Sequence, residues 1–290
     1  MLANTRELGG QDEKHGRLDF ALWIKPKPET IMRWASPWGI GFPGWHIECS
    51  AMSAKYLGDE FDIHGGGMDL AATHHTNEIA QSEACSHKQP AKYWMHTNML
   101  TVNGTRMSKS AGNGFLPGEL FTGNHPLLER GFSPMTVKFF MLQAHYRSTL
   151  DFSNDGLDAS EKGFRRLMNA VNLLEKLIPS ANSDFEIEPI VSNCVKAMND
   201  DFNSPVVIAE LFEAVRIINT VHDGKGNISE VELEKLKKLM NDFVFDVFGL
   251  KDEETSNTEL NSVLDLVIDI RKGAKENKDY ATSDKIRQQL

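Results

Sequence analysis

The first 150 residues alternate short apolar runs with glycine-rich turns. Apolar side chains at helical spacing predict a helix over residues 46–57, which Gly58 is placed to end. Residues 69–85 are expected to form a loop followed by a second helix. Strands are predicted over residues 61–64, 93–96 and 99–102, the first stopping at three glycines and the last followed by an Asn-Gly turn. Such alternation is typical of a nucleotide-binding α/β sheet.

Beyond residue 150 the apolar positions follow the helical period. Amphipathic helices are predicted over residues 163–177, 205–221, 231–248 and 260–270. Their apolar stripes are expected to pack inward, as in a helical bundle. The run 223–234 resembles a calcium loop, but Ile228 stands where that loop requires glycine, so we interpret it as a helix–helix turn. The predicted fold class is therefore α/β followed by all-α.

The distribution of charge divides the chain at the same place. Residues 1–150 carry 14 Lys+Arg and 14 Asp+Glu, whereas residues 151–290 carry 17 and 27, so the net charge of −10 arises in the second part. An acidic protein has no general attraction for phosphate backbones, and any nucleic-acid partner needs a local basic surface. The length of 290 residues suggests about two domains.

The cysteines and the apolar runs indicate the compartment. Only three cysteines occur, widely spaced, at Cys49, Cys85 and Cys194, which argues against a disulfide framework and for a reducing compartment. No apolar segment follows Met1 as in a signal peptide, and no run reaches the roughly 18 residues of a membrane span. We therefore expect a cytoplasmic protein without a membrane segment.

Potential metal ligands gather between residues 46 and 78. His74 and Glu78 are four residues apart, so on a helix they share one face and can converge on one ion. Cys49 can add a thiolate, and a Cys, His and Glu set with an open position suits catalytic zinc. From spacing alone, three other side chains compete as ligands: His46, Glu48 and His75.

Two further segments carry groups suited to a nucleotide. His64-Gly65-Gly66-Gly67-Met68-Asp69 follows a predicted strand, its glycines allow close backbone approach, and its carboxylate can accept hydrogen bonds from ribose. Arg106-Met107-Ser108-Lys109-Ser110 offers two cations and two hydroxyls in a loop flanked by glycine, which suits a triphosphate.

Taken in order, these motifs resemble those of one enzyme family. The motifs are Gly44-Trp45-His46-Ile47-Glu48-Cys49-Ser50-Ala51-Met52, His64-Gly65-Gly66-Gly67, His74-His75-x-Asn77-Glu78-Ile79-Ala80-Gln81 and Arg106-Met107-Ser108-Lys109-Ser110. Together they resemble a cysteinyl-tRNA synthetase of class I, over nearly the whole chain. That family uses ATP to form cysteinyl-adenylate and transfers the cysteinyl group to the 3′ end of tRNA(Cys).

The resemblance implies a role for each matching residue. Cys49, His74 and Glu78 are expected to hold Zn²⁺, which selects the substrate thiolate, while Trp45 lies beside the bound cysteine. ATP, with Mg²⁺, is expected to meet His64, Gly66, Asp69 and Lys109. Lys109 and Arg106 are the expected catalytic cations of the KMSKS-type loop, whose first lysine is replaced here by Arg106. The implied partners are tRNA(Cys), L-cysteine and ATP, and the intact protein is expected to be a monomer.

The resemblance also suggests three regions. We expect the C-terminal half of a Rossmann catalytic domain with the zinc ligands over 1–105, the KMSKS-type loop and stem-contact region over 106–155, and an anticodon-side helical bundle over 156–290. The family's first strand, first zinc-ligating cysteine and His-Ile-Gly-His signature do not occur in residues 1–42. The chain is therefore expected to be a partial fragment lacking the N-terminal half, inactive by itself and weak in zinc binding.

Two alternatives remain open. The cysteine ligases of mycothiol synthesis resemble these synthetases but join cysteine to an amino sugar. The run Ala197-Met198-x-Asp200-Asp201-Phe202-Asn203-x-Pro205 resembles the anticodon-side bundle and favours the synthetase. The other alternative is a non-catalytic zinc-binding or nucleotide-binding remnant.

Overall fold

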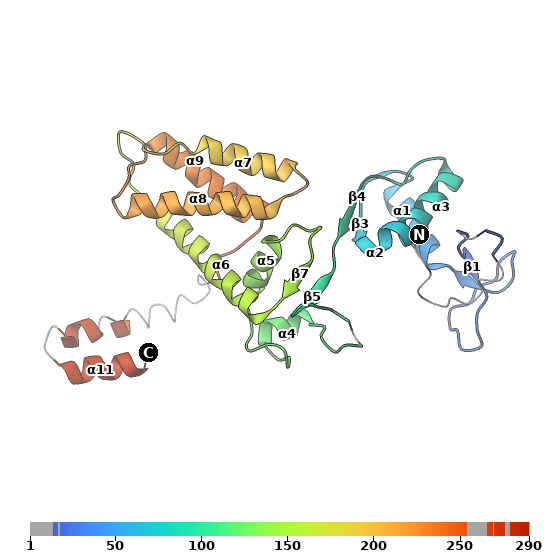
Figure 1. Ribbon diagram of the computed structural model, residues 1–290, viewed down its shortest axis with the longest axis horizontal. Coiled ribbons are helices and arrows are strands. Elements are labelled where there is room, and N and C mark those ends of the chain that lie inside the picture. Colours follow the sequence, from blue (N-terminus) through green and yellow to red (C-terminus); the bar gives the residue numbers. More distant parts are fainter. Residues whose placement is uncertain are drawn as a thin grey trace. The chain divides into compact units, whose positions relative to one another are not determined.

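A computed structural model describes residues 14–16, 18–108, 110–253, 266–268, 270–275 and 279–289 of the chain (Figure 1). Its contacts divide the chain into two units. Unit 1 comprises residues 1–112 and 146–151, and unit 2 comprises residues 113–145 and 152–290.

Unit 1 is built around a parallel strand pair joined by a helical crossover. β3 (Phe61–Gly67) pairs in parallel with β4 (Ala91–Thr97). Between them run α2 (Met68–Leu70), the π-helix η2 (Ala71–His75) and α3 (Thr76–Ser86). Parallel strands need such a crossover because the chain has to return to the same end of the sheet. Before this motif, β1 (Trp23–Ile24) pairs antiparallel with β2 (Phe42–Pro43), and α1 (Trp45–Leu57) follows.

Several predicted elements of unit 1 are confirmed, and two need correction. The helix over 46–57 is α1, and Gly58 ends it with φ +92°. The strand predicted to stop at the three glycines instead continues through them, because β4 supplies partners from Met95 to Thr97. The expected loop after residue 69 is helical from Met68 onward.

Unit 1 also contains most of a three-stranded sheet, in which β5 and β6 are antiparallel. β5 (Leu100–Val102) lies between β6 (Thr105–Arg106) and β7 (Leu150–Phe152). The predicted Asn103-Gly104 turn joins β5 to β6, with φ +50° and +75°, values that the favoured two-residue hairpin turn requires. The Asp151 carboxylate accepts hydrogen bonds from Thr101 Oγ1 at 2.6 Å and from the Gly104 amide at 2.8 Å.

Unit 2 is helical. Among its described residues, the helices include α4 (Pro117–Thr122), α5 (Pro134–Leu142), α6 (Asn154–Leu174), α7 (Glu188–Asn199), α8 (Ser204–His222), α9 (Glu230–Met240), η3 (Asn241–Val247) and α11 (Tyr280–Gln289). The helix predicted from residue 163 begins nine residues earlier, because Ser153 caps its polar first turn by accepting a hydrogen bond from the Gly156 amide. Most of the helix predicted over 260–270 lies outside the described residues.

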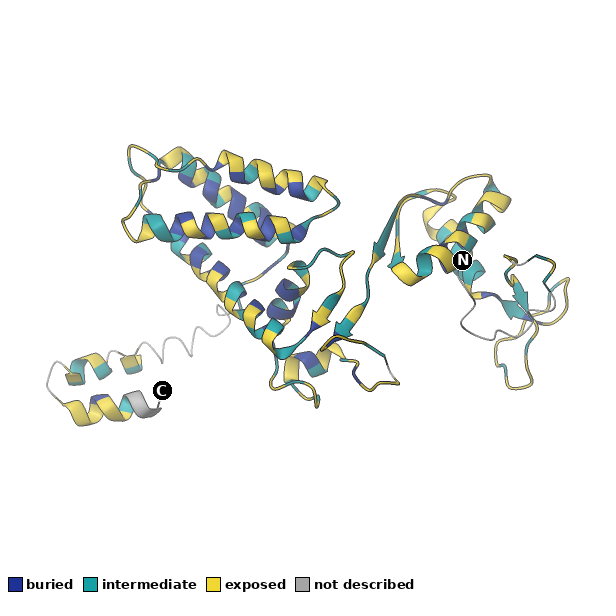
Figure 2. Cartoon of the chain, in the orientation of Figure 1, coloured by how far each residue is buried: buried dark blue, intermediate teal, exposed yellow. Residues whose placement is uncertain are grey.

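The apolar core lies in unit 2. α5, α6, α7, α8, α9 and η3 contribute buried side chains to one cluster, which includes Phe139, Leu167, Cys194, Leu211 and Leu236. Figure 2 shows the buried positions concentrated on the inward faces of these helices. In unit 1, by contrast, α1 has no buried residue.

The predicted order of α/β followed by all-α is confirmed. No helix among the described residues is long and apolar enough to span a membrane.

Candidate metal centre

The crossover helix directs three polar side chains into the interior of unit 1. His74, His75 and Glu78 are each only 3% exposed. The two histidines end the π-helix, whose wider turn changes the direction of side chains and is common at functional sites. Because buried polar groups need partners, the surroundings of these three residues indicate their role.

The sulfur, nitrogen and oxygen atoms of Cys49, His74 and Glu78 converge. His74 Nε2 lies 3.4 Å from Cys49 Sγ and 2.9 Å from Glu78 Oε1. One ligand atom from each of the three residues lies within 4.8 Å of the other two. Zinc bonds of about 2.0–2.3 Å in tetrahedral geometry separate ligand atoms by roughly 3.3–3.8 Å. The His74–Cys49 distance lies in this range and the His74–Glu78 distance is shorter, so the three residues expected to hold zinc are close enough together to share one ion.

The Glu78 carboxylate also has the properties expected of a metal ligand. Its Oε1 is buried and accepts no hydrogen bond, although His74 Nε2 lies nearby, so the two atoms meet without hydrogen-bond alignment. Burial raises the pKa of the Glu78 carboxyl, and His74 partly offsets this. An atom with a free lone pair beside a nitrogen and a sulfur is the arrangement that a cation would stabilise.

The Cys49 thiol lies in an environment that resists ionisation unless a cation is close. Burial raises its pKa, and the carboxylates of Glu78 and Glu48 raise it further. A coordinated divalent ion reverses this because it favours the thiolate directly. The side chains present thus fit a zinc ion better than a set of simple hydrogen bonds.

The second ring nitrogen of His74 contacts the side chain of His46. His46 Nδ1 lies 2.7 Å from His74 Nδ1, which leaves His74 Nε2 directed at Cys49 and Glu78. Metal-ligating histidines commonly have such a partner on the other nitrogen, which selects the tautomer and the ring orientation. Burial, followed by the charge of His74, lowers the pKa of His46. His46, one of the competing candidate ligands, therefore contacts His74 and is not part of the Cys49, His74 and Glu78 group.

The second oxygen of Glu78 faces a further group of imidazoles. His64 Nε2 lies 3.2 Å from Glu78 Oε2, and the His64 and His75 rings are 4.7 Å apart. His75 Nδ1 in turn lies 2.8 Å from His96 Nε2. Burial and the neighbouring His64, His96 and His74 lower the pKa of His75 to about 4, so its ring is neutral at pH 7.

Sequence reasoning missed two members of this group, Trp94 and His96. Both lie on β4, and the Trp94 ring is 4.8 Å from that of His64 and 5.1 Å from that of His75. The signal was the strand period of two, which places alternate residues 94 and 96 on one face. Nothing local indicated that this face would meet the crossover helix.

Gly66 has a packing role in this group. A Cβ atom built on Gly66 would lie 2.8 Å from His75 Cε1 and 3.2 Å from Leu70 Cδ1. The absence of a side chain at this position therefore makes room for the buried imidazole. The expectation that Gly66 meets ATP remains a prediction.

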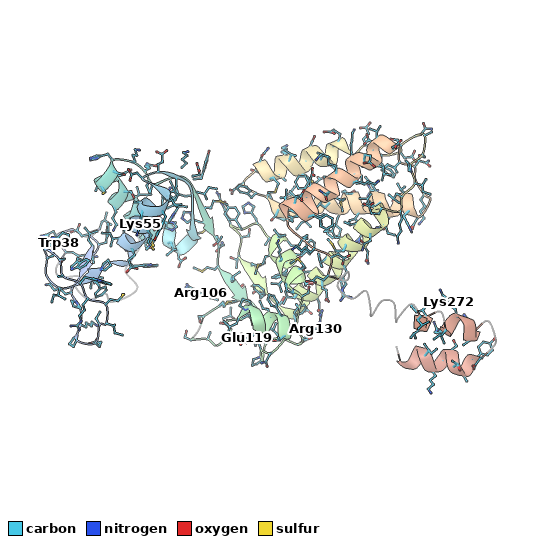
Figure 3. The ribbon with its side chains drawn as sticks, turned by 180° about the vertical axis from the view of Figure 1, so that it is seen from behind. Trp38, Lys55, Arg106, Glu119, Arg130 and Lys272 are labelled. Carbon is cyan, nitrogen blue, oxygen red and sulfur yellow. The ribbon has the colours of Figure 1, made fainter. Side chains whose placement is uncertain are left out.

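The other expected site residues are Trp45, Asp69, Arg106 and Lys109. The Trp45 ring is 4.1 Å from the His74 ring and is 59% exposed, so one face can meet a ligand. Asp69 is exposed on α2, and Arg106 is exposed on β6, where Figure 3 labels it. Lys109 lies outside the described residues. Beside it, Ser108 Oγ accepts a hydrogen bond from the Ala111 amide at 3.2 Å.

The sequence of this chain matches two family models and several known proteins. The model described as "tRNA synthetases class I (C) catalytic domain" matches residues 2–162, and the model described as "DALR domain" matches residues 194–251. The cysteine–tRNA ligases of Parabacteroides distasonis and Bacteroides fragilis are 54% and 52% identical over 294 residues. Each alignment covers 100% of this chain and 60% of the relative, so the chain spans about 60% of the length of these relatives.

A solved structure supports the fold. The agnB2 LeuRS of Agrobacterium radiobacter K84, in a ternary complex with tRNA and LeuAMS, matches with a TM-score of 0.50 at 15% sequence identity. The match covers 79% of this chain and 37% of that one. We conclude, from a catalytic-domain match over more than half of its residues, that the chain belongs to the class I tRNA synthetase family, in the cysteinyl group that its motifs resemble.

Proposed function

We propose that this chain supplies the cysteine-selecting site and the helical bundle of a cysteine–tRNA ligase. The observation that carries the proposal is the convergence of Cys49, His74 and Glu78 next to the half-exposed ring of Trp45. The names of the relatives support the same activity. The DALR match over 194–251 favours a tRNA ligase over a ligase for an amino sugar.

The proposed reaction has two steps. A carboxylate oxygen of cysteine attacks the α-phosphorus of ATP, the bond to the bridging oxygen breaks, and pyrophosphate leaves with its electron pair. A ribose hydroxyl at the tRNA 3′ end then attacks the carbonyl carbon, loses its proton, and AMP leaves. Neither step requires a covalent bond to the protein, so the side chains act by binding, orienting and stabilising charge.

In this proposal the three ligands serve substrate choice. Cys49, His74 and Glu78 would hold zinc, which when bound lowers the pKa of a thiol and prefers sulfur to a hydroxyl oxygen. The contact of His46 Nδ1 with His74 Nδ1 would keep His74 in the tautomer that ligates through Nε2. The exposed face of the Trp45 indole borders the position of the amino acid. Serine would lose the metal–sulfur bond, a larger difference than an apolar pocket provides between similar side chains.

The nucleotide side of the proposal rests on charge and on backbone access. Lys109 and Arg106 would stabilise negative charge on the phosphates as pyrophosphate leaves. His64 lies in the middle of β3, while Gly66 and Asp69 lie at its carboxyl end and in the first turn after it, where open α/β sheets bind ligands. Mg²⁺ would accompany ATP.

A zinc titration tests the ligand assignment. We expect the purified chain to bind one zinc ion, and Cys49→Ser to weaken binding by at least about tenfold, in the range of altered metal-site residues. Cys85→Ser is the matched control, since Cys85 is exposed and outside the cluster. Equal zinc affinities for the two serine variants would contradict the assignment. Zinc is expected to be removable by a chelator, and stoichiometric zinc that resists a chelator would refute weak binding.

Substrate selection needs a separate measurement. Calorimetry with a non-hydrolysable cysteinyl-adenylate analogue should detect binding to the zinc-loaded chain, with the seryl analogue bound much more weakly. If Glu78→Gln bound the two analogues with equal affinity, the result would support the role of Cys49, His74 and Glu78 in selecting the thiol. If both analogues bind equally to the unaltered chain, zinc does not select the thiol.

We further propose that the chain by itself does not complete the reaction. The chain spans about 60% of the length of these relatives, and its residues 1–42 contain no His-Ile-Gly-His signature. We expect cysteine-dependent ATP–pyrophosphate exchange to remain at background. Exchange clearly above that of a Cys49→Ser preparation would refute this expectation.

A further inference from the structure

One segment of unit 1 remains unexplained by the cysteine site: the loop between β1 and β2. Its tip, residues 34–41, is closed by a pair of backbone hydrogen bonds between Trp34 and Gly41, at 2.8 and 2.9 Å. A second pair joins Ser36 and Gly39, at 3.1 and 3.0 Å. We call residues 34–41 the Trp38 hairpin, and Figure 3 labels Trp38 on it.

Polar contacts hold in shape both the Trp38 hairpin and the segment just before it. The Arg33 guanidinium donates to the backbone carbonyls of Thr30, Lys27 and Pro28, at 2.6–2.8 Å. Ser36 Oγ donates to the Gly39 carbonyl at 2.7 Å and accepts from the Trp38 amide at 3.2 Å. A loop ordered in this way loses little conformational entropy when it binds a partner.

This ordered loop presents large aromatic surfaces to solvent. Trp38 is 76% exposed and Trp34 is 51% exposed. Trp38 is backed on one side by Trp23, with ring centroids 6.4 Å apart. Neighbouring exposed tryptophans on a preformed turn form an aromatic surface, and tryptophan is enriched at the residues that contribute most to binding.

The charge of the same segment differs from that of the chain. Between Trp23 and Gly44 there are three cations, Lys25, Lys27 and Arg33, against one carboxylate, Glu29, which gives +2 in a chain whose net charge is −10. A local basic surface is what an acidic protein needs in order to meet a phosphate backbone. Aromatic faces interleaved with cations suit single-stranded nucleic acid, whose bases stack while its phosphates pair with lysine.

Both ends of the loop are anchored at the candidate metal centre. β1 and β2 pair at its base, and Trp45, two residues beyond β2, contacts His74. Ahead of β1, the Phe20 ring lies 5.6 Å from the His46 ring. The base of this loop therefore lies beside the proposed cysteine site.

We propose that the Trp38 hairpin is a contact site for single-stranded RNA, in which Trp38 stacks on a base and Lys25 and Lys27 meet the flanking phosphates. The proposal rests on the proposed ligase function for the source of the RNA, the unpaired 3′ end of a tRNA. It adds a partner-binding element to a region for which the cysteine site provides no role.

Fluorescence anisotropy with the 290-residue chain tests this proposal. The probe is a 5′-labelled, unstructured RNA of about ten nucleotides, within the usual site sizes for such contacts. Trp38→Ala should weaken binding about tenfold, as expected for the loss of one stacked base, and Trp38→Phe should restore most of it. Lys27→Gln should reduce the slope of log affinity against log salt by about one.

A matched control is available in the same unit. Tyr56 is an aromatic residue on α1 that is 73% exposed and lies next to a lysine, and Tyr56→Ala should leave RNA affinity unchanged. Equal affinities for the unaltered chain and Trp38→Ala would overturn the proposal. So would an equal loss in Tyr56→Ala, an equal effect of Trp38→Ala on duplex RNA, or no detectable RNA binding.

Failure of the ligase proposal would be recognised separately. Calorimetry of the unaltered chain with the cysteinyl-adenylate analogue reports on the cysteine site and contains no RNA. If the analogue fails to bind while RNA affinity still depends on Trp38, the hairpin proposal stands and only the identity of the RNA is reopened. If the analogue binds and the Trp38 dependence is absent, the hairpin proposal alone is wrong.

Discussion

At the scale of single residues, burial determines the chemistry of the candidate centre. The Glu78 carboxyl and the Cys49 thiol both have raised pKa values, mainly through burial, whereas burial lowers the pKa of His64 and His75. All four shifts favour neutral side chains. A bound divalent cation would offset this because it stabilises the ionised carboxylate and thiolate. The cost of burying these polar groups is therefore consistent with a metal-binding role.

Gly66→Ala tests the packing of this centre. The new Cβ would approach His75 within 3 Å, so we expect a loss of about 1–3 kcal/mol in the stability of unit 1, as for other overpacked sites. Gly65→Ala is the control, because its Cβ would meet only the Met95 carbonyl oxygen, at 3.7 Å. Denaturant unfolding followed by tryptophan fluorescence would measure both, because all five tryptophans lie in unit 1. Similar losses in the two variants would mean that His75 does not require the glycine.

Cys194 provides a prediction about alkaline stability. It is fully buried in unit 2, and burial, followed by the charge of Glu210, raises the pKa of its thiol from 9.0 to about 12. Because the folded state favours the protonated thiol, this contribution to stability is complete below pH 9 and is lost as pH rises toward 12. The free energy of unfolding of unit 2 should fall less over this range in Cys194→Ala. Parallel curves for the two proteins would contradict this.

At the scale of elements, local patterns predicted regular structure better than its irregular parts. α1 and α8 follow a clear helical period and ended close to the predicted residues. The π-helix at 71–75 has no such signature, since its wider turn depends on burying adjacent histidines against β3 and β4. The extension of β3 through three glycines likewise depends on a partner strand 30 residues away in sequence. Glycine is a poor strand former, and only pairing with β4 makes the extended conformation favourable.

The start of α6 can be tested through its cap. Ser153 accepts a hydrogen bond from the Gly156 amide, so Ser153→Ala should destabilise unit 2 by about 1 kcal/mol. Ser153→Asp keeps an acceptor at this position and should be nearly neutral. Chemical denaturation followed by far-ultraviolet circular dichroism would separate the two. Equal stabilities of the alanine and aspartate variants would show that the cap contributes little.

At the scale of the whole molecule, the two units differ in how much apolar surface they bury. Unit 2 holds the large cluster contributed by α5 through η3. In the described part of unit 1, the buried side chains include those of His74, His75 and Glu78, and α1 has none. Since apolar burial is the main source of stability, unit 2 should be the more stable unit.

Hydrogen exchange would measure this difference directly. Amides of α8 should exchange only through global opening of unit 2, because eight of its residues are buried. Amides of α1 should exchange much faster, through local opening. Zinc should slow exchange in α1 and α3 but leave α8 unchanged, since the proposed ligands lie in unit 1. If the amides of α1 were as well protected as those of α8 in the absence of zinc, the prediction that unit 2 is the more stable unit would be wrong.

Some properties of this protein follow from spacing along the chain, and others required distant segments to meet. The helical bundle, the i,i+4 pair His74 and Glu78, and the family motifs could be recognised from residues close in sequence. The meeting of Cys49 with His74, 25 residues later, and the placement of His96 beside His75 could not. These contacts depend on the parallel pairing of β3 with β4 and on the turn of the π-helix, and both are stabilised by non-local packing that no local pattern encodes.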